Sequence, residues 1–330
     1  MKKRQILQDG TKTSEIGLGC MSFAGFYGAT TEAEAHTTLA AALDLGIDFL
    51  DTANIYGMGV SESMIGSFLK GDDSKFTIAT KGSIWTDPAT GQRGFNNKAD
   101  HLRAELEKSL TRLGVEHVAL YYIHRRDPEL EIEAVMETLL ALKAEGKIGG
   151  IGFSEISPTS LRRASVIGPI DAVQSEYSLW TRYPDLGLVQ TCKELGVAFV
   201  PFSPLGRGMF GSKTPNPVEF GPNDFRNGNP RFVEPNYSYN AELVKPFKAY
   251  AADLGTTPIA LSLAWCLARG ANHLPIPGTR TSAHLKECAA GSDFNMTDDI
   301  MAEIERILPV GWAHGDRYTK AQWIGPEGYC

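Results

Sequence analysis

The stretch FLDTANIYG, residues 49–57, joins an apolar run to an aspartate, with a tyrosine five residues further on. Phe49 and Leu50 are typical of a buried strand, and Asp51 stands where such a strand would end. A carboxylate in that position is either the cap of a loop or a member of a buried site. Comparable apolar runs recur along the chain, so the stretch predicts one unit of a repeating strand and helix pattern.

Eight short apolar runs bounded by turn residues are predicted to be strands. They are EIGLGCM (15–21), IDFLD (47–51), FTIATK (76–81), LYYIH (120–124), IGGIGFS (148–154), DAVQS (171–175), VAFVPFS (197–203) and HLPIPG (273–278). Amphipathic helical segments lie between them. One opens with a Thr31/Glu34 capping box and stops at Gly46, and another stops at Gly114.

Strands that alternate with helices along the whole length predict a parallel sheet with right-handed crossovers, and eight such units can close into a (β/α)8 TIM barrel. We expect a single α/β barrel domain over residues 1–330, with a short N-terminal hairpin that turns at Asp9-Gly10. The alternative is an open doubly wound sheet. Against it, GLGCMSFAG (17–25) lacks the G-x-G-x-x-G spacing of a dinucleotide-binding turn.

Two irregular segments, residues 83–98 and 205–239, are predicted to be long loops at the C-terminal face of the barrel. The second is dense in glycine, proline and asparagine and carries six phenylalanine and tyrosine residues. That aromatic content favours an ordered cover over a free linker.

The composition argues against several classes of partner. A net charge of −7 over 330 residues provides no basic field for a phosphate backbone, so nucleic acid is not expected. The five cysteines are odd in number and form no C-x-x-C pair, which argues against disulfides or zinc and favours the cytoplasm. The amino terminus has no apolar signal core, and the apolar run PIALSLAWCLA is shorter than the roughly 20 residues of a spanning helix, so no membrane is expected. Monomer and homo-oligomer both remain open.

Four polar residues are predicted to meet at the carboxyl ends of the strands, where barrels place their active sites. They are Asp51, Tyr56, Lys81 and His124. Taken singly, each could serve an ordinary structural role, but a lysine that ends the run FTIATK is costly to bury unless it is paired.

Together the four residues suit proton transfer to a carbonyl oxygen that becomes an alkoxide. Tyr56 would be the acid, and the ammonium of Lys81 would lower the pKa of its phenol. Asp51 would hold Lys81 in place, and His124 would orient the carbonyl by a hydrogen bond. Asp51 in the opening stretch is therefore predicted to anchor the lysine that tunes the tyrosine.

None of these side chains can supply hydride, so a redox reaction requires a nicotinamide cofactor. Ser154 and Gln174 can bond a carboxamide, and Phe202 can stack on an aromatic ring. The segment FSPLGRG places Arg207 and backbone amides near a pyrophosphate, although PLGRG is also what an ordinary turn looks like. A helix that begins after the eighth strand, together with Arg280, can take a phosphate.

The motifs IGLGCMSF, FLDTANIYG, ATKG, YIHRRDP, GKIGGIGFSE, VQSEYS, PFSPLGRG and IPGTR have the order and spacing of the aldo-keto reductases, and the chain resembles that family over nearly its whole length. The resemblance is to its bacterial and plant branch of aldehyde and pyridoxal reductases. It implies a (β/α)8 barrel, NADPH bound at the barrel mouth, reduction of aldehydes and ketones, and the catalytic tetrad Asp51, Tyr56, Lys81 and His124.

The resemblance also implies individual cofactor contacts. It assigns the carboxamide to Ser154 and Gln174 and the pyrophosphate loop to Ser203, Leu205 and Arg207. The other implied cofactor positions are Met21, Phe202, Pro277, Gly278, Thr279, Arg280, His284, Glu287 and Cys288. Four positions depart from frequent family residues: Glu155, Phe202, His284 and Cys288. The last two weaken the expectation of a strong preference for NADPH, so NADH is also possible.

Two functional classes stay open at this point. One is an oxidoreductase, and the other is a cofactor-sensing or interaction subunit with little turnover, as in the potassium-channel β subunits that the family resembles. A metal-dependent barrel hydrolase is a third class, but the seven histidines form no ligand-spaced pair and no metal is predicted. The substrate pocket is expected to include Phe23, Tyr27, Trp85, Trp180 and parts of the 205–239 loop, walls that suit a range of small carbonyl substrates.

Overall fold

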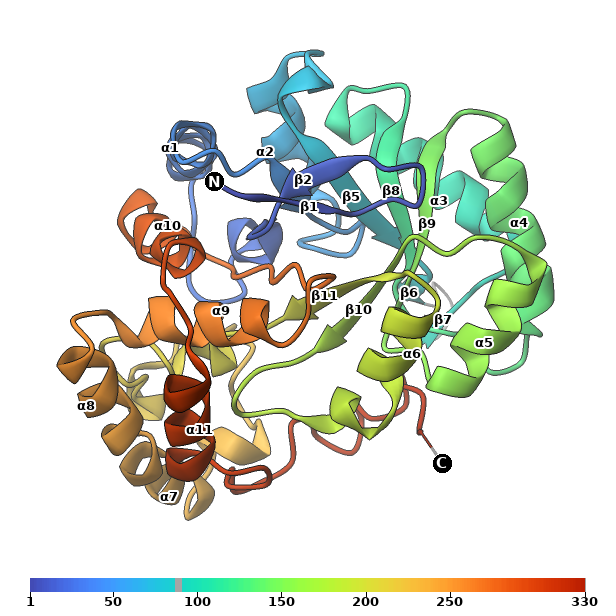
Figure 1. The fold of residues 1–330 in the computed structure, drawn as a ribbon. Coiled ribbons are helices and arrows are strands. Elements are labelled where there is room, and N and C mark those ends of the chain that lie inside the picture. The colour runs from blue at the N-terminus through green and yellow to red at the C-terminus, as the bar shows by residue number, and fades with distance from the viewer. Residues whose placement is uncertain (87–90, 330) are drawn as a thin grey trace.

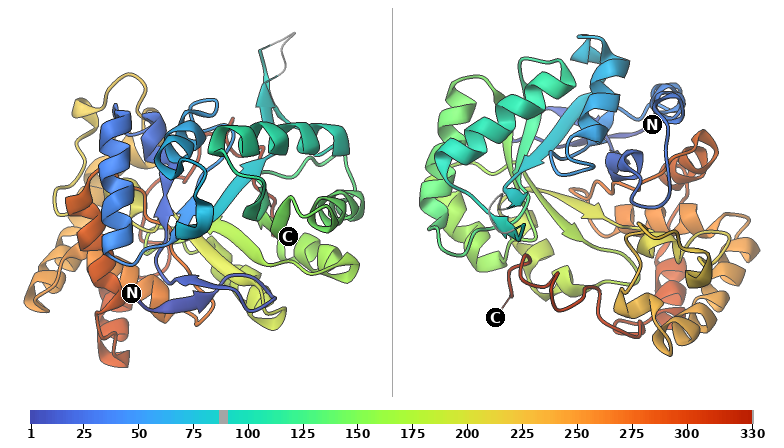
Figure 2. Two further views of the ribbon diagram at one scale, coloured as in Figure 1. Left: turned by 90° about the horizontal axis from the view of Figure 1, so that it is seen from above. Right: turned by 180° about the vertical axis from the view of Figure 1, so that it is seen from behind.

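Seven parallel strands form a sheet that curls into a barrel, with helices around its outside (Figures 1 and 2). The computed structural model describes residues 1–86 and 91–329. The strands follow one another around the sheet in the order β11, β10, β9, β8, β5, β4, β3. Their bounds are β3 Leu18–Gly19, β4 Phe49–Asp51, β5 Thr77–Gly82, β8 Val118–Ile123, β9 Ile148–Ser154, β10 Ala172–Glu176 and β11 Ala198–Phe202. Each pairing is parallel, as strand–helix–strand crossovers require.

The predicted eighth strand, residues 273–278, closes the ring through isolated bridges to β11 and to β3. The carbonyls of Pro275 and Pro277 accept hydrogen bonds from the amides of Gly17 and Gly19, each at 3.0 Å. Because proline has no N–H, this edge can accept from β3 but cannot donate to it. The segment therefore closes the barrel with an incomplete set of backbone hydrogen bonds, and the predicted (β/α)8 fold is confirmed.

The helices follow the strands in the predicted alternation. Their bounds are α1 Glu32–Asp44, α2 Val60–Leu69, α3 Ala99–Leu113, α4 Ile132–Ala144, α5 Pro158–Ile167, α6 Leu188–Glu194, α7 Asn236–Leu243, α8 Lys245–Asp253, α9 Pro258–Ala268, α10 Ser282–Ala289 and α11 Asp298–Ile307. The Thr31/Glu34 capping box is present at the start of α1. Gly46 and Gly114 follow α1 and α3 with φ angles of 72° and 69°, a left-handed conformation that ends each helix at its predicted stop.

The predicted hairpin, strands β1 (Lys3–Gln5) and β2 (Lys12–Ser14), covers one end of the barrel. Ile6 and Leu7, which follow β1, belong to the apolar cluster that fills the barrel interior with residues such as Phe49 and Leu120. The amide of Gln8 donates to Asp171 at 2.8 Å and ties the turn to the barrel. Since this end is sealed, the opposite end, at the carboxyl termini of the strands, is the one open to a ligand.

The two segments predicted as irregular contain more structure than expected. Within 83–98, strands β6 (Ile84–Thr86) and β7 (Arg93–Phe95) form an antiparallel hairpin, while residues 87–90 of that prediction lie outside the described part of the chain. The 205–239 segment carries the short 3-10 helices η4 (Gly206–Gly208), η5 (Pro217–Glu219) and η6 (Pro230–Phe232) and runs into α7. Phe210 and Phe232 are buried, as the prediction of an ordered cover requires.

Within the described residues, no single helix is long and apolar enough to cross a membrane, and the one helix pair that passes by length and composition, Asn236–Asp253 with Pro258–Ala268, is bent by 91°. Four cysteines, Cys20, Cys192, Cys266 and Cys288, are buried and free. The fifth, Cys330, lies outside the described residues.

Candidate active site

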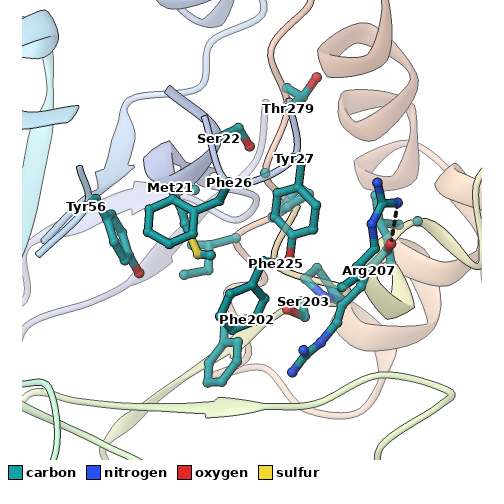
Figure 3. A pocket seen from close by; sticks show the side chains of 18 of the residues that line it. Met21, Ser22, Phe26, Tyr27, Tyr56, Phe202, Ser203, Arg207, Phe225 and Thr279 are labelled. Atoms are coloured by element: carbon teal, nitrogen blue, oxygen red, sulfur yellow. Dashed lines mark hydrogen bonds between the residues drawn. The ribbon is translucent and has the colours of Figure 1, made fainter. Parts of the chain in front are cut away.

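A cavity of about 890 Å³ opens at the carboxyl ends of the strands. Its walls come from the loops after β3, β4, β8 and β11, the β6–β7 hairpin, the start of α10 and the C-terminal segment, residues 316–329. Figure 3 shows Tyr56 at one end of this cavity and Arg207 at the other, with Phe26 and Tyr27 between them. The two ends carry different side chains and are described in turn.

Lys81 lies near the end of β5 and is completely buried. Its ammonium donates one hydrogen bond to Asp51 Oδ1 and another, at 2.8 Å, to the carbonyl of Thr52. The second oxygen of Asp51 accepts from Gln174 Nε2 at 2.7 Å. Strands β4, β5 and β10 therefore contribute to one polar cluster, because parallel pairing places their carboxyl-terminal parts on the same side of the barrel.

Burial shifts the titration of this pair in opposite directions. Removal from water raises the pKa of Asp51, and the charge and hydrogen bond of Lys81 oppose that rise. Burial likewise lowers the pKa of Lys81, and the charge of Asp51 opposes the fall.

Tyr56 lies in the loop between β4 and α2, with its ring facing the cavity (Figure 3). The Lys81 ammonium lies over this ring, 5.2 Å from its centroid. Burial raises the pKa of Tyr56 and the charge of Asp51 raises it further. The predicted net lowering of the Tyr56 pKa is therefore wrong, because desolvation of the phenol and the charge of Asp51 both disfavour the phenolate.

His124 follows β8 and packs edge-on against Tyr56, with 5.9 Å between the ring centroids. Its Nδ1 is buried and has no hydrogen-bond partner among the described residues. Burial lowers the pKa of His124 well below 6.5, and the charges of Arg125, Lys81 and Arg93 lower it further. The imidazole is therefore neutral at physiological pH and can offer one N–H.

The candidate carboxamide ligands also line the catalytic end. Ser154 ends β9, and its hydroxyl accepts from Arg125 Nη1 at 2.9 Å. Gln174 on β10 already donates to Asp51, which leaves its amide oxygen for another partner. Phe202 ends β11 and presents its ring to the cavity below Phe225 in Figure 3.

The predicted pyrophosphate loop after β11 has an unusual backbone conformation. Ser203 and Arg207 have positive φ angles of 49° and 55°, and both line the cavity with Leu205. The Arg207 guanidinium donates to Glu176 at 3.0 Å and lies over the ring of Tyr318. Arg207 is thus partly engaged within the protein, but its buried Nη1 has no partner among the described residues.

The far end of the cavity is formed by the turn into α10. Thr281 caps this helix by accepting from the amide of His284 at 3.3 Å, so the free amides of the first turn lie beside the cavity. Arg280 is held by a 3.0 Å bond to the carbonyl of Ala29. The remaining predicted cofactor positions also line the cavity: Met21, Pro277, Gly278, Thr279, Glu287 and Cys288.

The donors along the cavity fit a dinucleotide. One end has neutral groups for a carboxamide, and the other has cations and helix amides for phosphates. Glu287 Oε2 is buried at the cavity wall without a hydrogen-bond partner among the described residues, so it needs a donor from a ligand. An exocyclic amine of an adenine is such a donor.

Of the four predicted substrate walls, only Tyr27 lines the cavity. Phe23 lies in the core between barrel and helices, and Trp180 is buried against Trp312, stacked with 6.1 Å between ring centroids. Trp85, on β6, packs against His101 instead. These three predictions are wrong because aromatic residues near strand ends fill the core as readily as they line a pocket.

The cavity has further lining residues that the sequence pattern did not single out: Phe26, Arg93, Arg125 and Tyr318. Phe225, which also lines it, comes from the 205–239 loop that was expected to form part of the pocket wall. Phe26 and Phe225 pack edge-on with 6.1 Å between ring centroids, and the amide of Phe225 donates to Phe26 at 2.8 Å. The loop 205–239 is thereby tied to the loop after β3 across the cavity. Only the motif YIHRRDP, in which Arg125 follows His124, carried a signal that could have found one of these residues.

Glu155, one of the four departures from frequent family residues, has a structural partner. It has a φ angle of 56°, and its carboxylate accepts from Arg317 Nη1 at 2.9 Å and from the amide of Glu176 at 2.8 Å. Arg317 belongs to the C-terminal segment. Glu155 therefore holds the C-terminal segment over the mouth of the barrel. Among the described residues, no group of three or more His, Cys, Asp or Glu side chains could hold a metal ion.

Comparison with known proteins identifies relatives over nearly the whole chain. A family model described as the aldo/keto reductase family matches residues 15–309. The aldo-keto reductase yakc of Schizosaccharomyces pombe, whose name specifies NADP(+), is 37% identical over 308 residues, which cover 92% of this chain and 91% of that protein. The probable aldo-keto reductase 1 of Glycine max is 38% identical over 317 residues, which cover 94% of this chain and 89% of that protein.

Solved structures give the same result. A glycerol dehydrogenase from Gluconobacter oxydans superimposes with a TM-score of 0.83 at 25% identity, covering 93% of this chain and 94% of that one. An aldo-keto reductase from Bacillus halodurans superimposes with a TM-score of 0.78 at 24% identity, covering 98% of this chain and 99% of that one, which supports the fold.

Proposed function

This chain belongs to the aldo/keto reductase family, and we propose that it reduces the aldehyde and ketone groups of small molecules to alcohols. It is an NAD(P)H-dependent oxidoreductase that uses NADPH. The observation that carries the proposed reaction is the contact of Tyr56 with both the buried Lys81–Asp51 pair and a neutral His124 at one end of the cavity. The buried, free cysteines Cys20, Cys192, Cys266 and Cys288 agree with the cytoplasmic location we propose.

Several residues would hold the cofactor. Ser154 and Gln174 bond the carboxamide, Phe202 stacks on the ring, and the loop at Ser203 to Arg207 takes the pyrophosphate. Arg280, His284 and the first amides of α10 take the adenosine phosphate, and Glu287 accepts from the base. Bound NADPH supplies the hydride for the carbonyl carbon.

Tyr56 is the general acid in the proposed mechanism. As the carbonyl carbon is reduced, the oxygen becomes an alkoxide, which is a stronger base than a phenolate and takes the tyrosine proton even though burial raises the pKa of Tyr56. A raised pKa keeps the proton on the phenol until that moment. Lys81 faces the ring and stabilises the phenolate that remains.

His124 and the apolar walls position the substrate. The neutral imidazole donates an N–H to the carbonyl oxygen and directs it toward Tyr56, which contacts the same ring. Phe26, Tyr27 and Phe225 surround the reacting group with aromatic surface and exclude water. These aromatic walls make few demands on the carbon skeleton of the substrate, so we expect aldehydes of different shapes to be accepted.

The decisive experiment compares wild type with Tyr56→Phe in steady-state oxidation of NADPH by a panel of aldehydes, ketones and pyridoxal. We expect wild-type turnover and a loss of at least about a hundredfold in the variant, because general acid catalysis contributes 10²–10⁴-fold. The dissociation constant for NADPH, followed by tryptophan fluorescence, should be nearly unchanged in the variant. Turnover within a factor of a few of wild type would contradict the role of Tyr56, and negligible wild-type turnover on the whole panel would favour a cofactor-sensing subunit.

A further inference from the structure

Most arginines of this protein are neutralised by a neighbouring carboxylate. Of the sixteen arginines in the sequence, twelve lie within ion-pair distance of an Asp or Glu side chain. Four have no such partner among the described residues: Arg93, Arg125, Arg231 and Arg280. An arginine that lacks a carboxylate near a binding cavity is a candidate ligand for an anion.

Arg231 and Arg280 are engaged away from the catalytic end of the cavity. Arg231 donates to Thr181 Oγ1 at 2.8 Å and covers the ring of Trp180. Arg280 stands at the start of α10, where the cofactor phosphate is expected. Arg93 and Arg125 remain, and both line the cavity at the catalytic end.

Arg125 is fixed in place by neutral partners. Its Nη1 donates to the carbonyl of His124 at 2.6 Å and to Ser154 Oγ at 2.9 Å. The next residue, Arg126, turns the other way and pairs with Glu327 at 3.3 Å. The C-terminal segment packs on the Arg125 stem so closely that a Cβ added at Gly325 would lie 3.1 Å from Arg125 Cδ. The guanidinium is therefore held beside the catalytic histidine with its charge unpaired.

Arg93 adds a second positive charge at the same end. It begins β7 and is exposed at the cavity rim. Desolvation lowers the pKa of Arg93, and the charge of Arg125 lowers it further, so the two guanidinium groups repel each other. Both charges also act on His124. Two guanidinium groups at one end of a cavity, with no carboxylate beside them among the described residues, form a positively charged region that favours an anionic ligand over a neutral one.

The carboxylates that line the cavity do not supply a counter-ion for Arg93 and Arg125. Asp51 is engaged by Lys81, and Glu219 lies 3.2 Å from Lys213. Glu287 is on α10, at the cofactor-phosphate end. The cofactor phosphates are expected there as well, beside Arg280 and the loop after β11, and not beside β7 and β8.

We propose that Arg93 and Arg125 bind an anionic group of the substrate, so that the favoured substrates are aldehydes or ketones that also carry a carboxylate or a phosphate. The inference rests on the proposed carbonyl reduction and names its substrate class. An arginine fork binds two oxygens of either anion at once, which fixes orientation as well as position. Because Arg125 directly follows His124, an anion held there places the carbonyl of the same small molecule near Tyr56.

The test uses pairs of aromatic aldehydes in which one member carries an anionic group and the other carries a neutral group at the same position. 4-Formylbenzoate and its methyl ester present the same aromatic aldehyde with and without a carboxylate, and 4-formylphenyl phosphate with 4-methoxybenzaldehyde forms the phosphate arm. The quantity compared is the ratio of kcat/KM for the anion to that for its neutral partner, because a ratio cancels any general loss of activity. The enzymes are wild type, Arg93→Gln, Arg125→Gln and, as a charge-matched control at the cavity wall, Lys213→Gln.

We expect a wild-type ratio of about tenfold or more in at least one arm, since hydrogen bonds to charged groups are roughly twice as strong as neutral ones. The ratio should fall toward one in Arg93→Gln and Arg125→Gln and persist in Lys213→Gln, and the arm with the larger ratio identifies the anion. A ratio near one in wild type for both arms would overturn the inference, as would a ratio that falls equally in the Lys213→Gln control. If wild type reduces the neutral aldehydes well while its ratio is one, the carbonyl reductase function stands and only the anion site fails.

A binding measurement keeps the anion site testable if no aldehyde is reduced. Isothermal titration of the NADP(+)-loaded protein with 4-methylbenzoate and with its methyl ester, neither of which has an aldehyde to reduce or an alcohol to oxidise, measures the same charge preference without turnover. Tighter binding of the acid than of the ester in wild type, lost in Arg93→Gln, supports the anion site even where the proposed reaction fails. Equal binding of acid and ester overturns it. Thermal melting of each variant shows whether Arg125→Gln, which also loses the bond to Ser154, remains folded.

Discussion

Replacement of Lys81 by methionine tests whether the buried ammonium serves the chemistry or only the fold. The variant keeps most of the side-chain volume but removes the hydrogen bonds to Asp51 and to the carbonyl of Thr52. It also removes the cation that lies 5.2 Å from the centre of the Tyr56 ring. Asp51 is then left buried with Gln174 as its remaining side-chain hydrogen-bond donor among the described contacts.

The size of both effects follows from the geometry. With an effective dielectric constant of about 20 and the 5.2 Å from Lys81 Nζ to the ring centroid as the separation, the ammonium alone stabilises a developing phenolate by up to about 3 kcal/mol, or roughly a hundredfold in rate, against which the charge of Asp51 acts. Removing one partner of a buried ion pair costs about 3–5 kcal/mol of stability. Lys81→Met should therefore be both much slower and less stable than wild type.

A double variant separates the two consequences. In Asp51→Asn/Lys81→Met, no uncompensated charge is left in the core, and replacing both members of a buried pair is often close to neutral for stability. We expect the melting temperature to recover toward wild type while single-turnover hydride transfer stays well below the wild-type rate, because the cation facing Tyr56 is still missing; loss of the Asp51 charge, which opposes the phenolate, restores only part of the rate. Asp51→Asn alone should slow hydride transfer less than Lys81→Met, since the ammonium remains. If the double variant regains the wild-type rate, Lys81 acts only by neutralising Asp51 and the reasoning fails.

Two other outcomes are expected. Arg280→Ala should raise the KM for NADPH far more than the KM for NADH, because a charge-assisted contact of about 1.5–3 kcal/mol to a phosphate is lost, and equal effects in steady-state assays would place the phosphate elsewhere. His273 is buried in the core, with its Nδ1 3.1 Å from the carbonyl of Cys266, and burial lowers its pKa from 6.5 to about 4. Between these two pH values the unfolded chain binds more protons than the folded protein. The free energy of unfolding therefore falls as the pH falls. Chemical denaturation of wild type and His273→Leu at pH 7 and pH 4 should show that wild type loses ~3 kcal/mol more than the variant, and parallel losses would contradict the assigned pKa.

The barrel was predictable because its signals are local. An apolar run such as residues 76–81 identifies a strand by its own composition, and a capping box such as Thr31/Glu34 fixes where a helix begins. Parallel pairing then brings the last residues of successive strands to one rim, so Asp51 and Lys81 could be placed together before any contact was known. The eighth strand shows the limit of that reasoning, since two prolines leave it bridged but irregular.

The pKa of Tyr56 was mispredicted for a physical reason. Residue order along the strands was enough to place a cation near the phenol, but the pKa depends on net charge and on desolvation together. Asp51 contributes a charge of opposite sign to that of Lys81, and burial disfavours the phenolate regardless of either. Burial depends on packing from every side of a residue, which residue spacing does not reveal.

The mouth of the cavity was least predictable, because its walls come from segments without a helical or strand period. Residues 316–329 fold back over the barrel, and they are held there by contacts between residues far apart in the chain, such as Glu155 with Arg317, 162 positions away. A glutamate where relatives often have another residue is uninformative until its partner is placed. The same holds for YIHRRDP, where two adjacent arginines look alike in sequence. Arg126 is neutralised by Glu327 and Arg125 has no counter-ion among the described residues, so one fastens the C-terminal segment and the other leaves a charge for the substrate to meet.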